Sequence, residues 1–186
     1  MSIPHKNWHS RGYLPHCDTP GLFQGITFRL ADALPSGVLQ RMEQEDTADA
    51  AKRQRVEQFL NAGHGACLLR DPVCARLVEK ALLYGNGERY RLLAWVVMPN
   101  HVHVLIEQTE GWPLDKVVAG WKSCTAKQIN RYLGKCGVVW MRDYHDRYVR
   151  DDTHLQAVIE YIHDNPVKAG LAAHAKDWSY SSAAKR

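Results

Sequence analysis

A single Pro-Asn turn interrupts a long apolar stretch of the chain, and this break constrains the fold more than any other feature. The run RYRLLAWVVM (89–98) is followed by Pro99-Asn100 and then by HVHVLIE (101–107). Two apolar runs of strand length that are joined by a tight turn are typical of an antiparallel hairpin. We therefore predict two paired strands over residues 89–98 and 101–107.

The second of these strands carries two histidines, at positions 101 and 103. Side chains alternate between the faces of a strand, so His101 and His103 share one face while Val102 and Val104 share the other. Two imidazoles on one face need either hydrogen-bond partners or a metal ion. The pair is therefore a candidate metal site, and two hydrogen-bonded core histidines are the alternative.

Strand and helix signals alternate along the rest of the chain. Apolar runs predict a strand at 21–30 and a β-rich segment at 138–150, and residues 65–69 are interpreted as a further short strand. Helical periodicity and capping residues predict helices at 34–44 (continued or restarted over 45–60), 71–85, 112–134 and 151–166, with Pro166 ending the last of them. This order fits an α+β class, with a split β-α-β antiparallel sheet and helices packed on one face.

We expect one domain, over residues 22–171. Residues 1–21, rich in His, Gly and Pro, are expected to form an irregular N-terminal extension, and residues 172–186 a tail packed on the domain through Trp178 and Tyr180. No segment approaches the ~20 consecutive apolar residues that span a bilayer. The five cysteines show no CxxC spacing, which favours free thiols in a reducing cytoplasm.

The excess of positive charge lies in one part of the chain. The net charge is +4, and residues 112–186 carry all of it, with 12 Lys and Arg against 8 Asp and Glu. A basic segment of this kind favours a polyanionic partner such as nucleic acid. A merely solvated surface explains the same numbers equally well.

The last predicted helix supplies two further candidate groups. At ~100° per residue, Tyr161 and Asn165 lie one turn apart at the edge of the apolar stripe, so both face the same place. If this helix packs beside the histidine strand, one site holds two imidazoles, an amide oxygen and a phenol. A phenol is a nucleophile for phosphoryl transfer, and a divalent cation would polarise the phosphate. Phosphate and water ligands favour Mg²⁺ or Mn²⁺, although imidazole also suits zinc.

The segments WVVMPNHVHVLIE and YIHDNPVKAGL together resemble the HUH single-tyrosine transposases, and most of all the REP-associated tyrosine transposases. The resemblance extends over about residues 22–182 and implies a ferredoxin-like fold. It implies that His101 and His103 bind the metal and that Tyr161 is the nucleophile. It places Asn165 where relatives from insertion sequences carry Gln as the third ligand. The Asn side chain is shorter, and a helix C-cap before Pro166 is its alternative role.

The same resemblance implies the substrate and the reaction. The substrate is single-stranded DNA folded as a REP-type hairpin with a short guide sequence, and the reaction is a transesterification through a 5′-phosphotyrosine. Candidate phosphate contacts are Lys122, Arg142, Arg147 and Arg150, with Tyr144 available to a base. Arg11 and Tyr13 are candidates for seating the guide bases. Neighbouring aspartates that merely pair with these arginines are the alternative.

The resulting hypothesis is a metal-dependent single-stranded DNA endonuclease and strand transferase, associated with the bacterial nucleoid. The first alternative is a DNA-hairpin-binding protein that keeps the transposase fold without cleaving. The second is a small metal hydrolase that uses the two histidines without nucleic acid. Tyr148 is the next candidate nucleophile after Tyr161. Both a dimer with shared sites and a monomer with a self-contained site are compatible with the sequence, and a monomer is favoured.

Overall fold

The computed structural model describes residues 5, 7–11, 14–35, 37–38 and 49–185. Its centre is a four-stranded antiparallel sheet in the order β4-β5-β3-β6. The strands are β3 (Phe23–Arg29), β4 (Tyr90–Val97), β5 (His101–Gln108) and β6 (His145–Tyr148). The helices are α2 (Asp49–Asn61), α3 (Pro72–Tyr84), α4 (Leu114–Leu133) and α5 (Asp152–Lys168). The hairpin β4-β5 around Pro99-Asn100 and the α+β class are as predicted, and the strand order is that of the ferredoxin-like fold.

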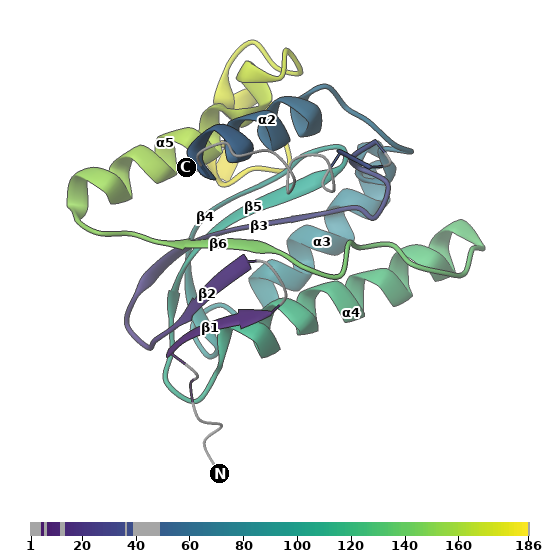
Figure 1. The fold of residues 1–186 in the computed structure, drawn as a ribbon. Helices are drawn as coiled ribbons and strands as arrows, with labels where there is room; N and C mark the ends of the chain where they lie inside the picture. Colours follow the sequence, from purple (N-terminus) through teal and green to yellow (C-terminus); the bar gives the residue numbers. More distant parts are fainter. Residues whose placement is uncertain (1–4, 6, 12–13, 36, 39–48, 186) are drawn as a thin grey trace.

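Helices cover both faces of this sheet, whereas the sequence predicted one covered face. Helices α3 and α4 lie on one side and α2 and α5 on the other (Figure 1). Alternation along β5 explains the division: Val102 and Val104 belong to the core with α3 and α4, while Leu105 packs with Ile162 of α5. Because His101 and His103 alternate with the two valines, they face the α5 side.

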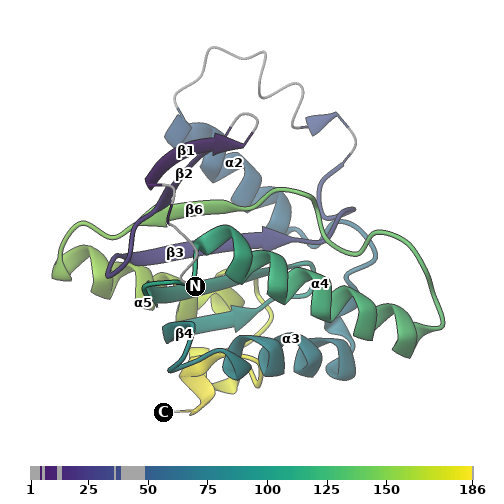
Figure 2. The same cartoon turned by 90° about the horizontal axis from the view of Figure 1, so that it is seen from below.

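Residues 1–21, expected to be irregular, include two paired strands. Strands β1 (Asn7–Arg11) and β2 (Leu14–Asp18) form a separate antiparallel pair that lies beside β6 (Figure 2). The strands escaped prediction because two of the residues that β2 buries, His16 and Asp18, are polar. His16 bonds to Asp146 of β6, and Asp18 accepts hydrogen bonds from the side chain of Gln108 and, at 3.0 Å, from the backbone of Leu114.

Two shorter predictions are also wrong. Residues 65–69 form no strand, because Cys67 adopts a left-handed conformation (φ 49°) and begins the 3-10 helix η1 (Leu68–Arg70). Pro166 does not end α5, which continues through it to Lys168. Proline removes one backbone donor, but here it lies in the last turn and is buried. The backbone of Ala169 then closes the helix by donating to the Asn165 carbonyl (3.0 Å).

The C-terminal segment contacts the free edge of β4. It contains the 3-10 helices η2 (Ala175–Asp177) and η3 (Ser182–Lys185). The Trp178 indole donates to the Val97 carbonyl (2.9 Å), and the Val97 amide donates to the Tyr180 carbonyl (2.8 Å). Among the described helices, none combines the length and the apolar character needed to cross a membrane.

Candidate active site

The histidines of β5 are buried and held in one orientation. His101 is 0% and His103 3% exposed. The Nδ1 atom of His101 lies 2.7 Å from the Asn100 amide oxygen, and that of His103 lies 2.8 Å from the Thr27 hydroxyl. Within the described part of the chain, neither Nε2 atom has a hydrogen-bond partner. Both rings therefore present an Nε2 atom to the same buried place.

The tautomer of His101 follows from its neighbour. The Asn100 amide nitrogen donates to the His64 carbonyl (3.0 Å), so its oxygen faces His101. An amide oxygen only accepts, so Nδ1 of His101 carries the proton and Nε2 carries a lone pair. Burial, followed by the proximity of His103, holds the pKa of His101 well below its ordinary value. A neutral imidazole with an available Nε2 lone pair is the form that binds a metal ion.

Helix α2 adds a carboxylate that was not expected from the sequence. One ligand atom each from Glu57, His101 and His103 lie within 4.8 Å of one another. The Glu57 carboxylate is 3.6 Å from Nε2 of His103. Burial alone would raise the pKa of Glu57, but its contacts with His103 and Tyr161 outweigh burial and lower it to about 2. Glu57 is therefore ionised at neutral pH.

Helix α5 brings Tyr161 and Asn165 to the same place. The Tyr161 ring centroid lies 5.3 Å from that of His103, and the Asn165 amide nitrogen donates to Glu57 (3.3 Å). The Tyr161 hydroxyl lies close enough to Glu57 and Asn165 for both side chains to act on its pKa. Burial, then the charge of Glu57, raises the pKa of the phenol far above its ordinary value of 10.0. The Asn165 amide oxygen is buried and has no partner among the described residues.

These groups form a donor set that fits a divalent cation. Two imidazole nitrogens, one carboxylate and one amide oxygen can fill up to four coordination positions of the cation and leave its other positions for phosphate or water. Both Nε2 atoms and the Asn165 oxygen are buried without a hydrogen-bond partner among the described residues, and a cation would satisfy them. Mixed nitrogen and oxygen donors do not by themselves choose among Mg²⁺, Mn²⁺ and Zn²⁺.

The residues predicted to contact DNA fall into separate groups. Arg147 lies opposite Gly25 of β3, and Gly25 lies opposite Leu105 of β5. Residues directly opposite one another share a face of the sheet, so Arg147 lies on the α5 face with Leu105. Arg147 and Arg150 are exposed, and both charges act on His154 in the first turn of α5. Lys122 lies elsewhere and donates to the backbone carbonyl of Arg142 (2.7 Å).

Arg11, Tyr13 and Tyr144 offer no described side chain that could contact a base. Tyr13 lies outside the described residues, as does the side chain of Arg11, whose backbone belongs to β1. Tyr144 cannot stack on a base in this conformation, because it is only 4% exposed and packs against the His16 ring at 4.6 Å between centroids.

Glu57 is the site residue that sequence reasoning missed. It lies 44 positions before His101, in a charged helix with no clear apolar stripe and several other acidic neighbours. No local spacing distinguishes Glu57 from Glu43, Glu45 or Asp49. Only the packing of α2 over β5 and α5 brings its carboxylate to the histidines.

Known proteins share both sequence and fold with this chain. The family model described as "Transposase IS200 like" matches residues 67–165. A REP-associated tyrosine transposase of Escherichia coli K12 is 26% identical over 110 residues, covering 58% of this chain and 63% of that protein. A Haemophilus influenzae protein whose name places it in the same group is 28% identical over 103 residues, covering 50% of this chain and 58% of that protein. The matches thus cover less than two thirds of either relative.

The fold has a solved counterpart. The chain superposes on the structure of a REP-associated tyrosine transposase bound to a REP hairpin with a TM-score of 0.56. The two share 19% sequence identity, over 94% of this chain and 81% of that one. At this level of identity the likeness concerns the fold.

Proposed function

Because the chain belongs to the IS200-like transposase family, we propose that it cleaves and rejoins single-stranded DNA, with Tyr161 as the nucleophile. The membership agrees with the resemblance seen in the HVH and YIHDNP segments. The observation that carries the proposal is the position of Tyr161. Its ring lies 5.3 Å from that of His103, and Glu57 and Asn165 of the same site act on the pKa of its hydroxyl.

The chain's own residues orient the phenol. We infer that the Tyr161 hydroxyl is directed at Glu57 and Asn165, because both side chains act on its pKa. Burial and the charge of Glu57 raise the pKa of the phenol, so it is protonated at neutral pH. We propose that His101, His103 and the Asn165 oxygen hold Mg²⁺ or Mn²⁺, and that Glu57 joins them. Such an ion would polarise a non-bridging phosphate oxygen and neutralise the charge that raises the pKa of Tyr161.

The reaction exchanges one phosphoester bond for another. The Tyr161 oxygen forms a bond to phosphorus while the bond to the 3′ oxygen breaks, and that oxygen leaves as a 3′-hydroxyl. The phenol proton passes to solvent, and solvent supplies the proton that converts the leaving 3′ oxygen into a hydroxyl. A second 3′-hydroxyl can reverse the exchange and join new strands, so the reaction needs no ATP.

The substrate we propose is a REP-type hairpin with a single-stranded foot. Arg147 lies on the face of the histidines, Arg150 lies close enough to His154 of α5 to act on it, and both supply charge for a phosphate backbone. All of the proposed catalytic groups lie in one chain, which is compatible with a monomer acting alone. A protein with this activity would act at the bacterial nucleoid.

The test is the formation of a covalent adduct. The chain is incubated with a labelled hairpin oligonucleotide and Mn²⁺, and the products are separated on a denaturing gel. The parent should give a slowly migrating protein–DNA band, which Tyr161→Phe abolishes while hairpin binding persists. Tyr148→Phe is the matched control and should leave the band intact. EDTA and His103→Ala should each remove the band.

Each contrary outcome points to one of the alternatives. A Tyr161→Phe protein that still forms the adduct would move the nucleophile elsewhere. A parent that binds the hairpin without ever forming an adduct would favour a non-cleaving DNA-binding protein. Metal-dependent hydrolysis of small phosphoesters without DNA binding would favour the simple hydrolase.

A further inference from the structure

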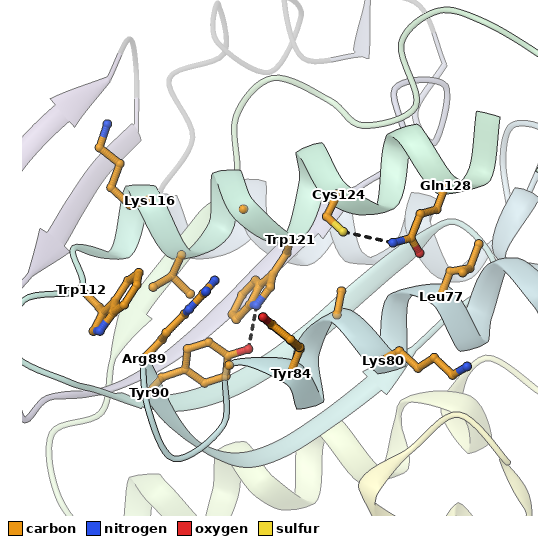
Figure 3. A pocket seen from close by; sticks show the side chains of 14 residues that line it. Leu77, Lys80, Tyr84, Arg89, Tyr90, Trp112, Lys116, Trp121, Cys124 and Gln128 are labelled. Atoms are coloured by element: carbon orange, nitrogen blue, oxygen red, sulfur yellow. Dashed lines mark hydrogen bonds between the residues drawn. The ribbon is translucent and has the colours of Figure 1, made fainter. Parts of the chain in front are cut away.

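A cavity lies between α3 and α4, on the face of the sheet opposite the histidines. Its volume is about 370 Å³, at the lower end of the ~300–1,000 Å³ typical of ligand sites. Figure 3 shows that it is enclosed by side chains of α3, of α4 and of the segments around Arg89 and Trp112. The proposed cleavage chemistry uses none of these residues.

The lining combines aromatic rings with positive charge. The rings are those of Tyr84, Tyr90, Trp112 and Trp121, and the cations are Lys80, Arg89 and Lys116. No Asp or Glu belongs to this lining. Lys116 and Lys80 stand near opposite ends of the cavity (Figure 3). Aromatic rings between two separated cations are complementary to a nucleotide, because the rings can contact its base and the cations can contact the phosphates on either side.

The inner wall of the cavity is rigid and its own polar groups are paired. The Trp121 indole donates to the Tyr90 hydroxyl (2.8 Å), which in turn donates to the Leu82 carbonyl. Tyr90 and Trp121 are 1% and 4% exposed. A ligand would therefore contact ring edges there, and it would not need to offer hydrogen bonds to the Trp121 indole or the Tyr90 hydroxyl, which are already paired.

Arg89 provides the specific polar contact. Its guanidinium carbon lies 4.7 Å from the ring centroid of Trp112 and 5.3 Å from that of Tyr84, which orients the group. The Nε atom of Arg89 is buried and has no hydrogen-bond partner among the described residues. An unpaired buried donor is costly, so this position favours a ligand that brings an acceptor.

We propose that this cavity binds one unpaired nucleotide of a DNA strand, with its base against the accessible rings of Tyr84 and Trp112 and its phosphates near Lys80, Arg89 and Lys116. The proposal rests on the proposed function only in taking DNA as the polymer. A phosphodiester fits better than an acidic peptide, because a base stacks on aromatic rings and its flanking phosphates match the separated lysines.

Gly120 offers a way to fill the cavity without disturbing the core. It lies inside α4 and lines the cavity, and a Cβ atom built there would meet no atom within 4 Å. Gly120→Leu should therefore be tolerated by the fold and should narrow the space for a base. Ala119→Leu is the matched control, because Ala119 is exposed on the same helix outside the lining.

Binding is measured by fluorescence anisotropy with a labelled, unstructured oligothymidylate. The protein carries Tyr161→Phe and the buffer contains EDTA, so that no strand is cleaved. Gly120→Leu and Trp112→Ala should each weaken binding at least about fivefold, since a stacked base contributes ~1–3 kcal/mol. Ala119→Leu and Lys127→Ala, which changes a lysine of α4 outside the cavity, should bind as the parent does.

A strand that lacks its bases distinguishes the contribution of base contacts to affinity from the contribution of phosphate charge. An oligonucleotide abasic throughout should bind the parent as weakly as the intact strand binds Gly120→Leu, and the two changes should not add. Equal parental affinity for abasic and intact strands would overturn the proposal, as would unchanged affinity in both cavity variants or a parent that binds no strand. Equally tight, cavity-dependent binding of free thymidylate or of an oligoglutamate would also overturn it.

The two proposals fail separately in these assays. A parent that forms the Tyr161 adduct while its cavity variants bind DNA normally refutes the cavity and leaves the nuclease. Cavity-dependent strand binding by a parent that never forms the adduct refutes the nuclease and supports the cavity.

Discussion

At the scale of single residues, the site depends on partners that hold the histidines. The Thr27 hydroxyl lies 2.8 Å from Nδ1 of His103, on the neighbouring strand β3. Thr27→Val keeps the branched shape but removes the hydroxyl, so His103 loses its orienting contact. We expect ~10–100-fold weaker Mn²⁺ binding by calorimetry. Thr27→Ser retains the hydroxyl and should bind nearly as the parent does, and equal losses in both variants would contradict the orienting role.

His16 makes a second prediction at this scale, concerning pH. Burial alone would lower its pKa, but its hydrogen bonds to Asp143 and Asp146 raise it from 6.5 to about 9. A raised pKa means that the folded state binds the proton more tightly, so this stabilisation is complete below pH 6.5 and is lost as the pH rises through about 9. Lys122, whose pKa burial lowers to about 8, titrates in the same range, so a comparison of variants is needed.

The measurement is the difference in melting temperature between the parent and His16→Asn across this pH range. The difference should be largest near pH 6 and should shrink toward pH 9.5, because only the parent has the imidazolium to lose. A difference that stays constant with pH would show that His16 is not charged in the folded protein.

At the scale of elements, two glycines in neighbouring helices make a matched test of close packing. A Cβ atom on Gly85, at the end of α3, would lie 2.8 Å from Cε1 of Tyr90, whose ring is fixed by two hydrogen bonds. Gly85→Ala should therefore destabilise the fold by about 1–3 kcal/mol through overpacking. Gly120→Ala, in open space on α4, should be neutral or stabilising by up to ~1 kcal/mol. Denaturant unfolding of both variants checks the contrast.

The same scale shows what a sequence can and cannot predict. Apolar runs and a Pro-Asn turn were enough to predict the hairpin β4-β5, and helical spacing was enough to place Tyr161 beside Asn165. The strand β2 was missed because it buries His16 and Asp18, whose partners Asp146 and Gln108 lie 130 and 90 positions away. The end of α5 was misplaced because the local rule for proline was outweighed by packing at Pro166. Long-range polar pairing leaves no local periodicity, so these features required the structure.

At the scale of the whole molecule, the candidate metal site joins three segments distant in sequence. Glu57 comes from α2, the histidines from β5 and Asn165 from α5, and the family match itself begins only at residue 67. An unfolded chain cannot hold these groups together. A cation that binds them therefore binds the folded state selectively and should stabilise all three segments at once.

This linkage gives a prediction that needs no DNA. At a free Mn²⁺ concentration about 100-fold above the dissociation constant, binding contributes ~2.7 kcal/mol. For a chain of this size that raises the melting temperature by about 5–10 °C. His103→Ala should abolish the increase because it removes a donor, and Glu57→Gln should reduce it because it removes the negative charge of the site. His174→Ala, at an imidazole 73% exposed and outside the cluster, is the matched control and should retain it. An increase that survives His103→Ala would place the cation elsewhere, because no rearrangement of the remaining donors restores an imidazole at that position of β5.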